Sequence, residues 1–410
     1  MGWSTAPPAG ELDPTFGEGG RVVTDLGGDD SAAGMAIQPD GRIVVVGQRV
    51  AGGGGGFVVS RYLTDGSLDP SFGEDGSVTT DIGQIDGANA VVLQGDGRIV
   101  VAGFAQSPGA DDVDVAVARY LGGGELDASF GIGGVVTTDI SGDDAALDVA
   151  LQPDGAIVVA GRAIRRGFDF ALARYLPDGT LDRSFGVGGK VRTEFSGNEV
   201  ALAVAIQDDG RIQAVGNVFN QRQSNFALAR YLASGDLDPS FGDDGRVTTA
   251  FGPGSNAATD VVLQDDGAIV VAGSVVPPRR ASNWALARYL PDGELDQTFG
   301  AHGRVRTSFG PLDDFALALV LQPDGRFVAA GTATGVDGGP DVAVARYLST
   351  GALDDSFGED GQVTTDFDGG EDYALDVALQ ADGKAVAAGR TLNLQTFGLD
   401  TVLARYLTDA

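Results

Sequence analysis

Oxygen-bearing side chains recur at one fixed place in this chain, eight residues before each Gln-x-Asp-Gly motif. They are Asp30, Asp86, Asp144, Glu199, Asn256, Asp314 and Asp372. Carboxylate and amide oxygens suit a divalent cation, most of all Ca²⁺, so the pattern predicts a ring of metal ligands if all seven face one opening. The alternative is structural, with each side chain accepting hydrogen bonds from its own loop as in a repeated Asx turn.

Arginines form a second candidate site. They fall in the third, fourth and fifth copies of a repeat described below, at Arg162, Arg165, Arg166, Arg222, Arg279 and Arg280. Guanidinium groups clustered on an acidic protein indicate an anionic ligand such as a phosphate, a carboxylate or an acidic sugar. The alternative is that they pair with neighbouring Asp side chains and bind nothing.

The amino-acid composition provides few of the side chains that enzymes use for catalysis. The chain has no Cys and a single His, His302, so a Ser/His/Asp triad or a His/Cys metal site is not expected. Paired carboxylates could still hydrolyse a glycoside, but a sevenfold ring lacks the asymmetry that separates an acid from a nucleophile. We therefore expect a non-enzymatic binding or scaffold protein. The alternatives are a hydrolase or lyase that uses these carboxylates, and a purely structural spacer in a larger protein.

A seven-copy repeat must position these residues. Each copy reads L-D-x-x-F-G, V-x-T, Q-x-D-G, V-V-A-G and A-R-Y-L, and its F-G phenylalanines are Phe16, Phe72, Phe130, Phe185, Phe241, Phe299 and Phe357. The distance from the Gln of Q-x-D-G to the Gly that closes the next apolar run is constant, as is the distance from the R-Y Arg to the next F-G. The stretch from that Gly to the Arg varies, and variable loops on a fixed scaffold are where binding usually occurs.

Apolar runs and turn signals divide each copy into four antiparallel strands. In the third copy these are Asp148–Leu151, Ile157–Ala160, Phe170–Tyr175 and Leu181–Thr193, which we call strands A, B, C and D. The chain starts in a D strand (Leu12–Leu26) and ends after a C strand, so the first strand can complete the last copy. This offset predicts an all-β, seven-bladed β-propeller closed by its N-terminal strand.

The whole repeat region is expected to be one domain. Residues 11–410 would form the propeller, with repeats starting near 12, 68, 126, 181, 237, 295 and 353, and residues 1–10 would be a disordered tail. The R-Y arginines should be half-buried and paired with an Asp, for which the Asp of the L-D motif is a candidate. Trp284 occupies a position held elsewhere by Phe and should be part of the core.

The repeat resembles the bacterial delta-60 repeat family over nearly the whole chain, from Leu12 to Leu407. The closest segments are Gly179–Gly186 (GTLDRSFG) and Phe170–Tyr175 (FALARY). The resemblance implies a repeat domain often found in large, frequently exported bacterial proteins, and it implies no catalytic residues.

The bulk composition sets the remaining expectations. A net charge of −31 argues against binding nucleic acid, and no apolar run is long enough for a membrane span. Residues 1–10 lack a signal-peptide pattern, so the compartment stays open, with a slight preference for an exported or cell-surface protein. We expect a monomer with a small-molecule, glycan or protein ligand on its variable face, and no required cofactor unless Ca²⁺ binds.

Overall fold

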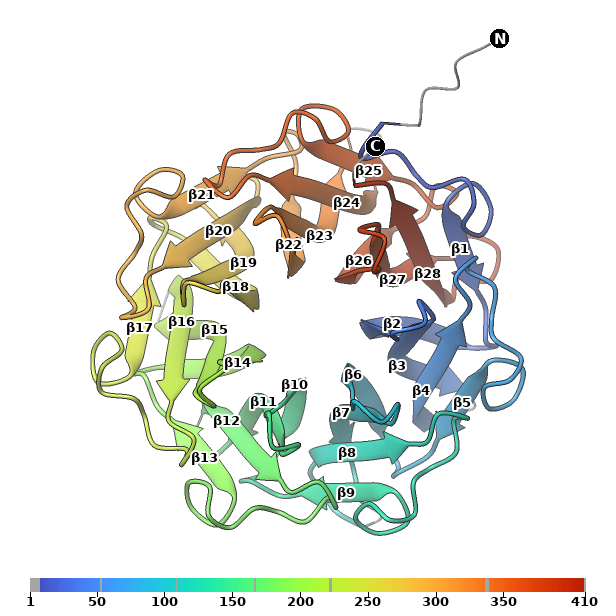
Figure 1. Ribbon diagram of the computed structural model, residues 1–410, viewed down its shortest axis with the longest axis vertical. Helices are drawn as coiled ribbons and strands as arrows, with labels where there is room; N and C mark the ends of the chain where they lie inside the picture. The colour runs from blue at the N-terminus through green and yellow to red at the C-terminus, as the bar shows by residue number, and fades with distance from the viewer. Residues whose placement is uncertain are drawn as a thin grey trace.

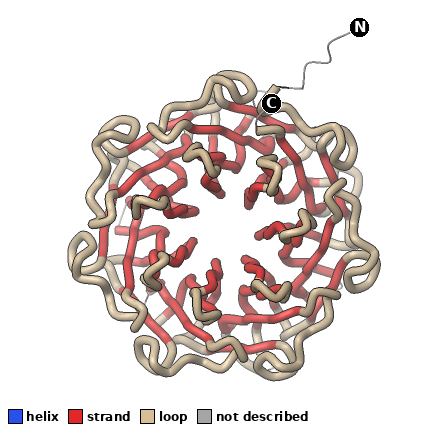
Figure 2. The backbone as a smooth tube through the Cα atoms, viewed as in Figure 1, coloured by secondary structure: helices blue, strands red, loops and turns tan. Residues whose placement is uncertain are grey.

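Four-stranded antiparallel sheets radiate around a central axis in the computed structural model (Figure 1). The structure describes residues 8–51, 54–107, 109–165, 167–220, 223–335 and 339–408. There are seven such sheets, so the predicted seven-bladed propeller is confirmed. Blade 1 is β2–β5, blade 2 is β6–β9, and so on to blade 7, which is β26–β28 with β1. In the described residues there is strand and loop only (Figure 2), and no helix long and apolar enough to cross a membrane.

The strands of each blade follow the predicted order from the axis outward. The innermost A strands are β2 (Asp29–Ile37), β6 (Asp86–Leu93), β10 (Ala145–Leu151), β14 (Asn198–Ile206), β18 (Ser255–Leu263), β22 (Asp314–Leu321) and β26 (Asp372–Leu379). The B strands are β3 (Ile43–Ala51), β7 (Ile99–Ala105), β11 (Ile157–Ile164), β15 (Ile212–Asn220), β19 (Ile269–Val276), β23 (Phe327–Thr334) and β27 (Ala385–Leu392).

The outer half of each blade consists of a long and a short strand. The C strands are β4 (Gly54–Tyr62), β8 (Asp114–Tyr120), β12 (Phe168–Tyr175), β16 (Gln223–Tyr231), β20 (Asn283–Tyr289), β24 (Pro340–Tyr347) and β28 (Leu399–Tyr406). The D strands are β5 (Ser77–Thr80), β9 (Val135–Thr138), β13 (Lys190–Thr193), β17 (Arg246–Thr249), β21 (Arg304–Thr307), β25 (Gln362–Thr365) and β1 (Arg21–Thr24).

The predicted D strand was too long. The sequence predicts this strand over Leu181–Thr193 in the third copy, but only Lys190–Thr193 pairs with the C strand. The preceding F-G-x-G-G segment is a turn because Gly186 and Gly189 have φ angles of 50° and 97°, which break an extended strand. Leu181 contributes only an isolated bridge to Tyr175.

The ring closes as the sequence offset predicts. Strand β1 pairs antiparallel with β28, with Arg21 opposite Ala404 and Thr24 opposite Thr401. Gly10 extends this contact by donating from its N to Leu407 O at 2.6 Å, and Ala9 O joins the segment to the C–D turn of blade 6 by accepting from Gly358 N at 2.8 Å. Residues 1–7 of the expected tail lie outside the described residues.

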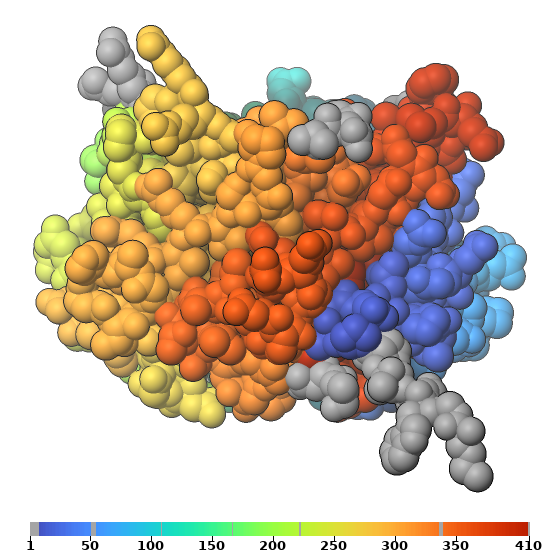
Figure 3. All heavy atoms as spheres, turned by 90° about the horizontal axis from the view of Figure 1, so that it is seen from above, coloured from blue at the N-terminus to red at the C-terminus, as the bar shows by residue number. Residues whose placement is uncertain are grey.

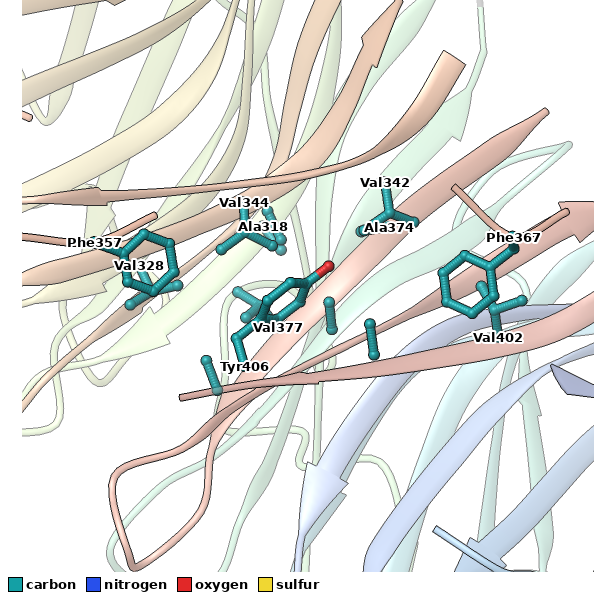
Figure 4. Close-up of a cluster of buried hydrophobic side chains, with 14 of the residues drawn as sticks. Ala318, Val328, Val342, Val344, Phe357, Phe367, Ala374, Val377, Val402 and Tyr406 are labelled. Atoms are coloured by element: carbon teal, nitrogen blue, oxygen red, sulfur yellow. The ribbon is translucent and has the colours of Figure 1, made fainter. Parts of the chain in front are cut away.

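The apolar core lies between neighbouring blades. There are seven clusters of buried side chains, and each combines strands of two blades. In the cluster of Figure 4, Val328 and Phe357 of blade 6 pack with Val377 and Tyr406 of blade 7. Each blade therefore needs its neighbour to bury its faces, as expected for repeat proteins.

The R-Y arginines link the blades on the face of the C–D turns. Arg174 Nε donates to Asp182 Oδ2 of the L-D motif at 2.8 Å, so the predicted pairing is confirmed. Its Nη1 also donates to the main-chain oxygen of Ala233 in the next blade, and its guanidinium lies 4.6 Å from the Phe185 ring centroid. All seven copies have the Arg–Asp pair, at Arg61, Arg119, Arg174, Arg230, Arg288, Arg346 and Arg405.

Candidate functional site

The variable loops lie on one face of the ring. The D–A and B–C connections leave the strands at the same end, and the A–B and C–D turns leave at the other. In the edge-on view of Figure 3, B–C segments of blades 2, 5 and 7 (teal, gold and red) project from the same side of a thick disc. We call this side the loop face.

The seven recurring oxygen-bearing residues lie at the loop-face ends of the innermost strands. These residues are at most 1% exposed, so their side chains are buried at the ends of the strands and do not face open solvent. Burial follows from the D–A loops, which fold over them. Gly83 N donates to Asp86 Oδ2 at 3.0 Å, and Ser141 N donates to Asp144 Oδ2 at 2.8 Å.

One side-chain oxygen of each of these residues, which for Asn256 is its single amide oxygen, has no hydrogen-bond partner among the described residues. These atoms are Asp30 Oδ1, Asp86 Oδ1, Asp144 Oδ1, Glu199 Oε2, Asn256 Oδ1, Asp314 Oδ1 and Asp372 Oδ1. Burial, together with the nearby charges of Asp139 and Asp114, raises the pKa of Asp144 to about 6. The pKa of Asp372 is also raised, mainly by burial.

Further acids, which the sequence analysis did not single out, join two of these residues. Carboxylate oxygens of Asp114, Asp139 and Asp144 all lie within 4.8 Å of one another, and so do those of Asp341, Asp366 and Asp372. Each group combines the start of a C strand, the residue after a D strand and the start of the next A strand. The signal was the recurrence of Asp at the same three repeat positions, which only an alignment of the copies reveals.

The predicted arginine patch is divided between blades. Arg162 lies over the Phe168 ring at 5.3 Å, whereas Arg165 is exposed in the β11–β12 turn of blade 3. Arg279 and Arg280 are exposed in the β19–β20 turn of blade 5. The remaining two members, Arg166 and Arg222, lie outside the described residues.

A hollow on the loop face lies where blade 3 meets blade 4. It has a volume of 1220 Å³ and is lined by Arg165, Gly167, Asp169, Arg192, Glu194, Ser196, Gly197, Asn198, Glu199, Phe219 and Asn220. The repeat is irregular here. Blade 3 has Arg192 and Glu194 at the positions that Thr137 and Asp139 occupy in blade 2. The hollow includes Arg165 but neither of the blade 5 arginines.

Charges within the hollow are partly balanced. Arg192 forms an ion pair with Asp169, and Glu199 Oε1 accepts hydrogen bonds from Ser196 N and Gly197 N at 3.0 and 2.6 Å. Arg165 and Glu194 are the exposed charges that remain. The arrangement therefore offers one donor group and one acceptor group to a ligand beside the exposed Phe219 ring.

Three other acids on innermost strands were missed by the sequence analysis. Each accepts a hydrogen bond from the next blade: Asp148 from Val204 N at 2.7 Å, Asp260 from Leu319 N at 2.6 Å, and Asp376 from Met35 N at 2.6 Å. Burial raises the pKa of Asp148 to about 7 and that of Asp376 to about 7. Since both oxygens of Asp148 accept main-chain N–H groups, we interpret these acids as links between blades.

Trp284 and His302 lie where the sequence predicts. Trp284 is fully buried, lies 4.7 Å from the Phe309 ring and donates from Nε1 to Thr332 O at 3.1 Å, so it is part of the core. His302 is exposed in the turn before β21, which is on the face opposite the hollow.

Sequence comparison identifies the repeat. Residues 38–72, 94–130, 152–185, 207–241, 264–299 and 322–357 match the domain of unknown function (DUF5122) β-propeller family. The chain belongs to this family. Each match runs from the Q-x-D-G turn through strands B and C to the F-G turn, so the repeats are of a β-propeller type. No curated protein matches the chain in sequence.

Several solved structures share the fold at low sequence identity. The periplasmic gluconolactonase PpgL of Pseudomonas aeruginosa is 15% identical with a TM-score of 0.53, covering 89% of this chain and 96% of that chain. The polysaccharide lyase Uly1 is 12% identical with a TM-score of 0.51, covering 92% and 90%. A PL25 ulvan lyase bound to -[GlcA(1-4)Rha3S]- is 9% identical with a TM-score of 0.50, covering 95% and 96%.

Proposed function

We propose that this propeller is a non-enzymatic binding module and that the hollow between blades 3 and 4 binds an acidic oligosaccharide. The observation that carries the proposal is the hollow itself, where exposed Arg165, Glu194 and Phe219 occur together on the loop face. Concave sites with an aromatic side chain and a few convergent polar groups are typical of ligand binding.

The lining favours an acidic sugar over the other anions that the arginines suggested. The Arg165 guanidinium can bind a carboxylate with two parallel hydrogen bonds. Glu194 repels a phosphate more strongly than a uronate, because the phosphate carries more negative charge, and only the sugar has hydroxyls that can donate hydrogen bonds to the Glu194 carboxylate. Phe219 is 46% exposed and can pack against the apolar face of a sugar ring.

Size favours an oligomer over a single sugar. The volume of 1220 Å³ exceeds the roughly 300–1,000 Å³ of usual small-molecule pockets. Two proteins of similar fold are named as polysaccharide lyases, which supports the idea that a β-propeller can bind a sugar chain. That likeness is one of fold only.

A hydrolase or lyase that uses the recurring carboxylates is the alternative function. Those carboxylates are buried and bound to their own loops, as Asp86 and Asp144 are, which leaves them poorly placed to reach a substrate. The resemblance to the delta-60 repeat, which implies no catalytic residues, also supports a binding role.

Calorimetry with oligomers of galacturonate and glucuronate tests the proposal, with neutral glucose oligomers as the comparison. We expect binding of a uronate oligomer and a loss of at least about tenfold in affinity for Arg165→Ala, equivalent to about 1.4 kcal/mol. The matched control is Arg183→Ala, which removes an exposed arginine of the same blade from the opposite face and should leave affinity unchanged.

The same mixtures distinguish binding from catalysis. A binding module leaves the oligomers intact, whereas a lyase would generate the ultraviolet absorbance of an unsaturated uronate and a hydrolase would generate new reducing ends. Absence of uronate binding, or equal affinities of the Arg165→Ala protein and the unsubstituted protein, would contradict the proposed site.

A further inference from the structure

The two three-carboxylate groups occupy equivalent places in the ring. Asp114, Asp139 and Asp144 lie where blade 2 meets blade 3, and Asp341, Asp366 and Asp372 lie where blade 6 meets blade 7. We call them the 2/3 cluster and the 6/7 cluster. In each, the D-strand member is exposed, the C-strand member is half-buried, and the A-strand member is buried. Each cluster is therefore open to solvent on one side.

The buried member of each cluster has one oxygen without a hydrogen-bond partner. Asp144 and Asp372 are 0% exposed, and each uses Oδ2 to accept main-chain N–H while Oδ1 makes no hydrogen bond of ordinary geometry among the described residues. The Thr391 hydroxyl lies close enough to Asp372 to oppose the rise in its pKa, and Asp144 has no such neighbour in the described part of the chain. A buried carboxylate oxygen left unpaired is costly, and a cation that binds there would remove that cost. The cluster supplies two more carboxylates within reach of the same ion.

Other junctions with three acids place an arginine of the chain beside them. Where blade 7 meets blade 1, the equivalent acids are Asp25, Asp30 and Asp400, and Arg49 Nε lies 3.9 Å from Asp30 Oδ1. Where blade 3 meets blade 4, the equivalents are Asp169, Glu194 and Glu199, and Arg192 forms an ion pair with Asp169. A positive charge accompanies the acids at both of these junctions.

No such ion pair is present for the carboxylates of the 2/3 and 6/7 clusters within the described part of the chain. Lys190 and Arg21 come near, but they donate to the main-chain oxygens of Asp139 and Asp366, at 2.5 and 2.7 Å. Within the described residues, the carboxylates of each cluster therefore form no ion pair with a basic side chain.

We propose that the 2/3 and 6/7 clusters are two divalent-cation sites that bind Ca²⁺. Oxygens within 4.8 Å of one another can all contact one Ca²⁺, because ligands at 2.3–2.6 Å on opposite sides of the ion are about 4.6–5.2 Å apart. Mg²⁺ fits less well, since opposite ligands at 2.0–2.1 Å are only about 4.2 Å apart and its geometry is stricter. Bound Ca²⁺ would join two blades at each junction.

Calorimetric titration of the full chain with CaCl₂, in excess NaCl, tests this proposal. We expect two ions per chain, one ion for Asp139→Asn, and none for Asp139→Asn combined with Asp366→Asn. Both positions are exposed, so the variants should fold. The matched control is Asp81→Asn, which removes the same charge after β5 at a junction where Gly56 replaces the C-strand acid.

The outcomes separate clearly. Absence of Ca²⁺ binding would overturn the proposal, as would two ions bound by the Asp139→Asn protein, or an equal loss for Asp81→Asn. The sites are independent of the oligosaccharide hollow, so Arg165→Ala should still bind two ions. Failure of sugar binding would leave the cation result unaffected, and failure of cation binding would leave the sugar result unaffected.

Discussion

Arg174 and Asp182 illustrate how single residues hold this ring together. The pair is largely buried, with side chains 11% and 14% exposed, and it adds a hydrogen bond to the next blade and a contact with the Phe185 ring. Removing one partner from a buried pair leaves the other charge poorly satisfied, which costs more than the intact pair contributes. The R-Y arginine is therefore structural in every copy.

We expect Arg174→Ala to lower the free energy of unfolding by about 2 to 4 kcal/mol. Urea denaturation measures this change, with Arg183→Ala in the same blade as the control because its side chain is exposed. A cost below about 0.5 kcal/mol, which is the usual size for a surface substitution, would show that the pair does not hold the blades.

Residue roles could be predicted from the sequence only where they repeat. The Arg–Asp pair and the buried Trp284 were predicted because each copy has the same type of residue at the same place. The 2/3 cluster was not predicted, since Asp114 and Asp139 come from different strands and only the contact between blades brings them to Asp144. The hollow was partly predicted through Arg165, but the contribution of Phe219 depends on the way two loops meet.

The element that matters most for the ring is its first strand. β1 supplies the outer strand of blade 7, and its place could be predicted because the repeat frame is offset at the chain ends. The strand lengths were less predictable. Gly residues with positive φ shorten each D strand, and a β-bulge in strand A lies opposite the closing Gly of strand B.

That closing Gly has a steric reason. At Gly161 an added Cβ would lie 1.9 Å from Ala145 O, because the bulge between Ala146 and Asp148 brings strand β10 close to β11. The constant spacing from Q-x-D-G to this Gly therefore records a bulge that occurs at one place in all seven blades.

Deleting residues 1–26 should unfold or oligomerise the protein. The deletion removes β1 and exposes the edge of β28, and an unpaired strand edge favours association. Light scattering and thermal melting measure the effect. A truncated chain that stays monomeric with an unchanged melting temperature would contradict closure by β1.

The whole molecule combines a regular ring with one variable face. The C–D face repeats the same Arg–Asp pairs in all seven blades, whereas the loop face carries the hollow, the two carboxylate clusters and the exposed arginines. The net charge of −31 repels anions at long range, so an acidic ligand must be recognised by local contacts such as those of Arg165. Binding of such a ligand should therefore strengthen with added salt, until screening weakens the local contacts as well.

Amide hydrogen exchange with and without an oligogalacturonate tests most directly whether the loop face is the binding face. We expect slower exchange in the segments 192–199 and 219–220, which contain lining residues of the hollow, and unchanged exchange in the C–D turns of the opposite face. Slower exchange confined to the C–D turns, or no change anywhere at saturating oligomer, would contradict binding on the loop face.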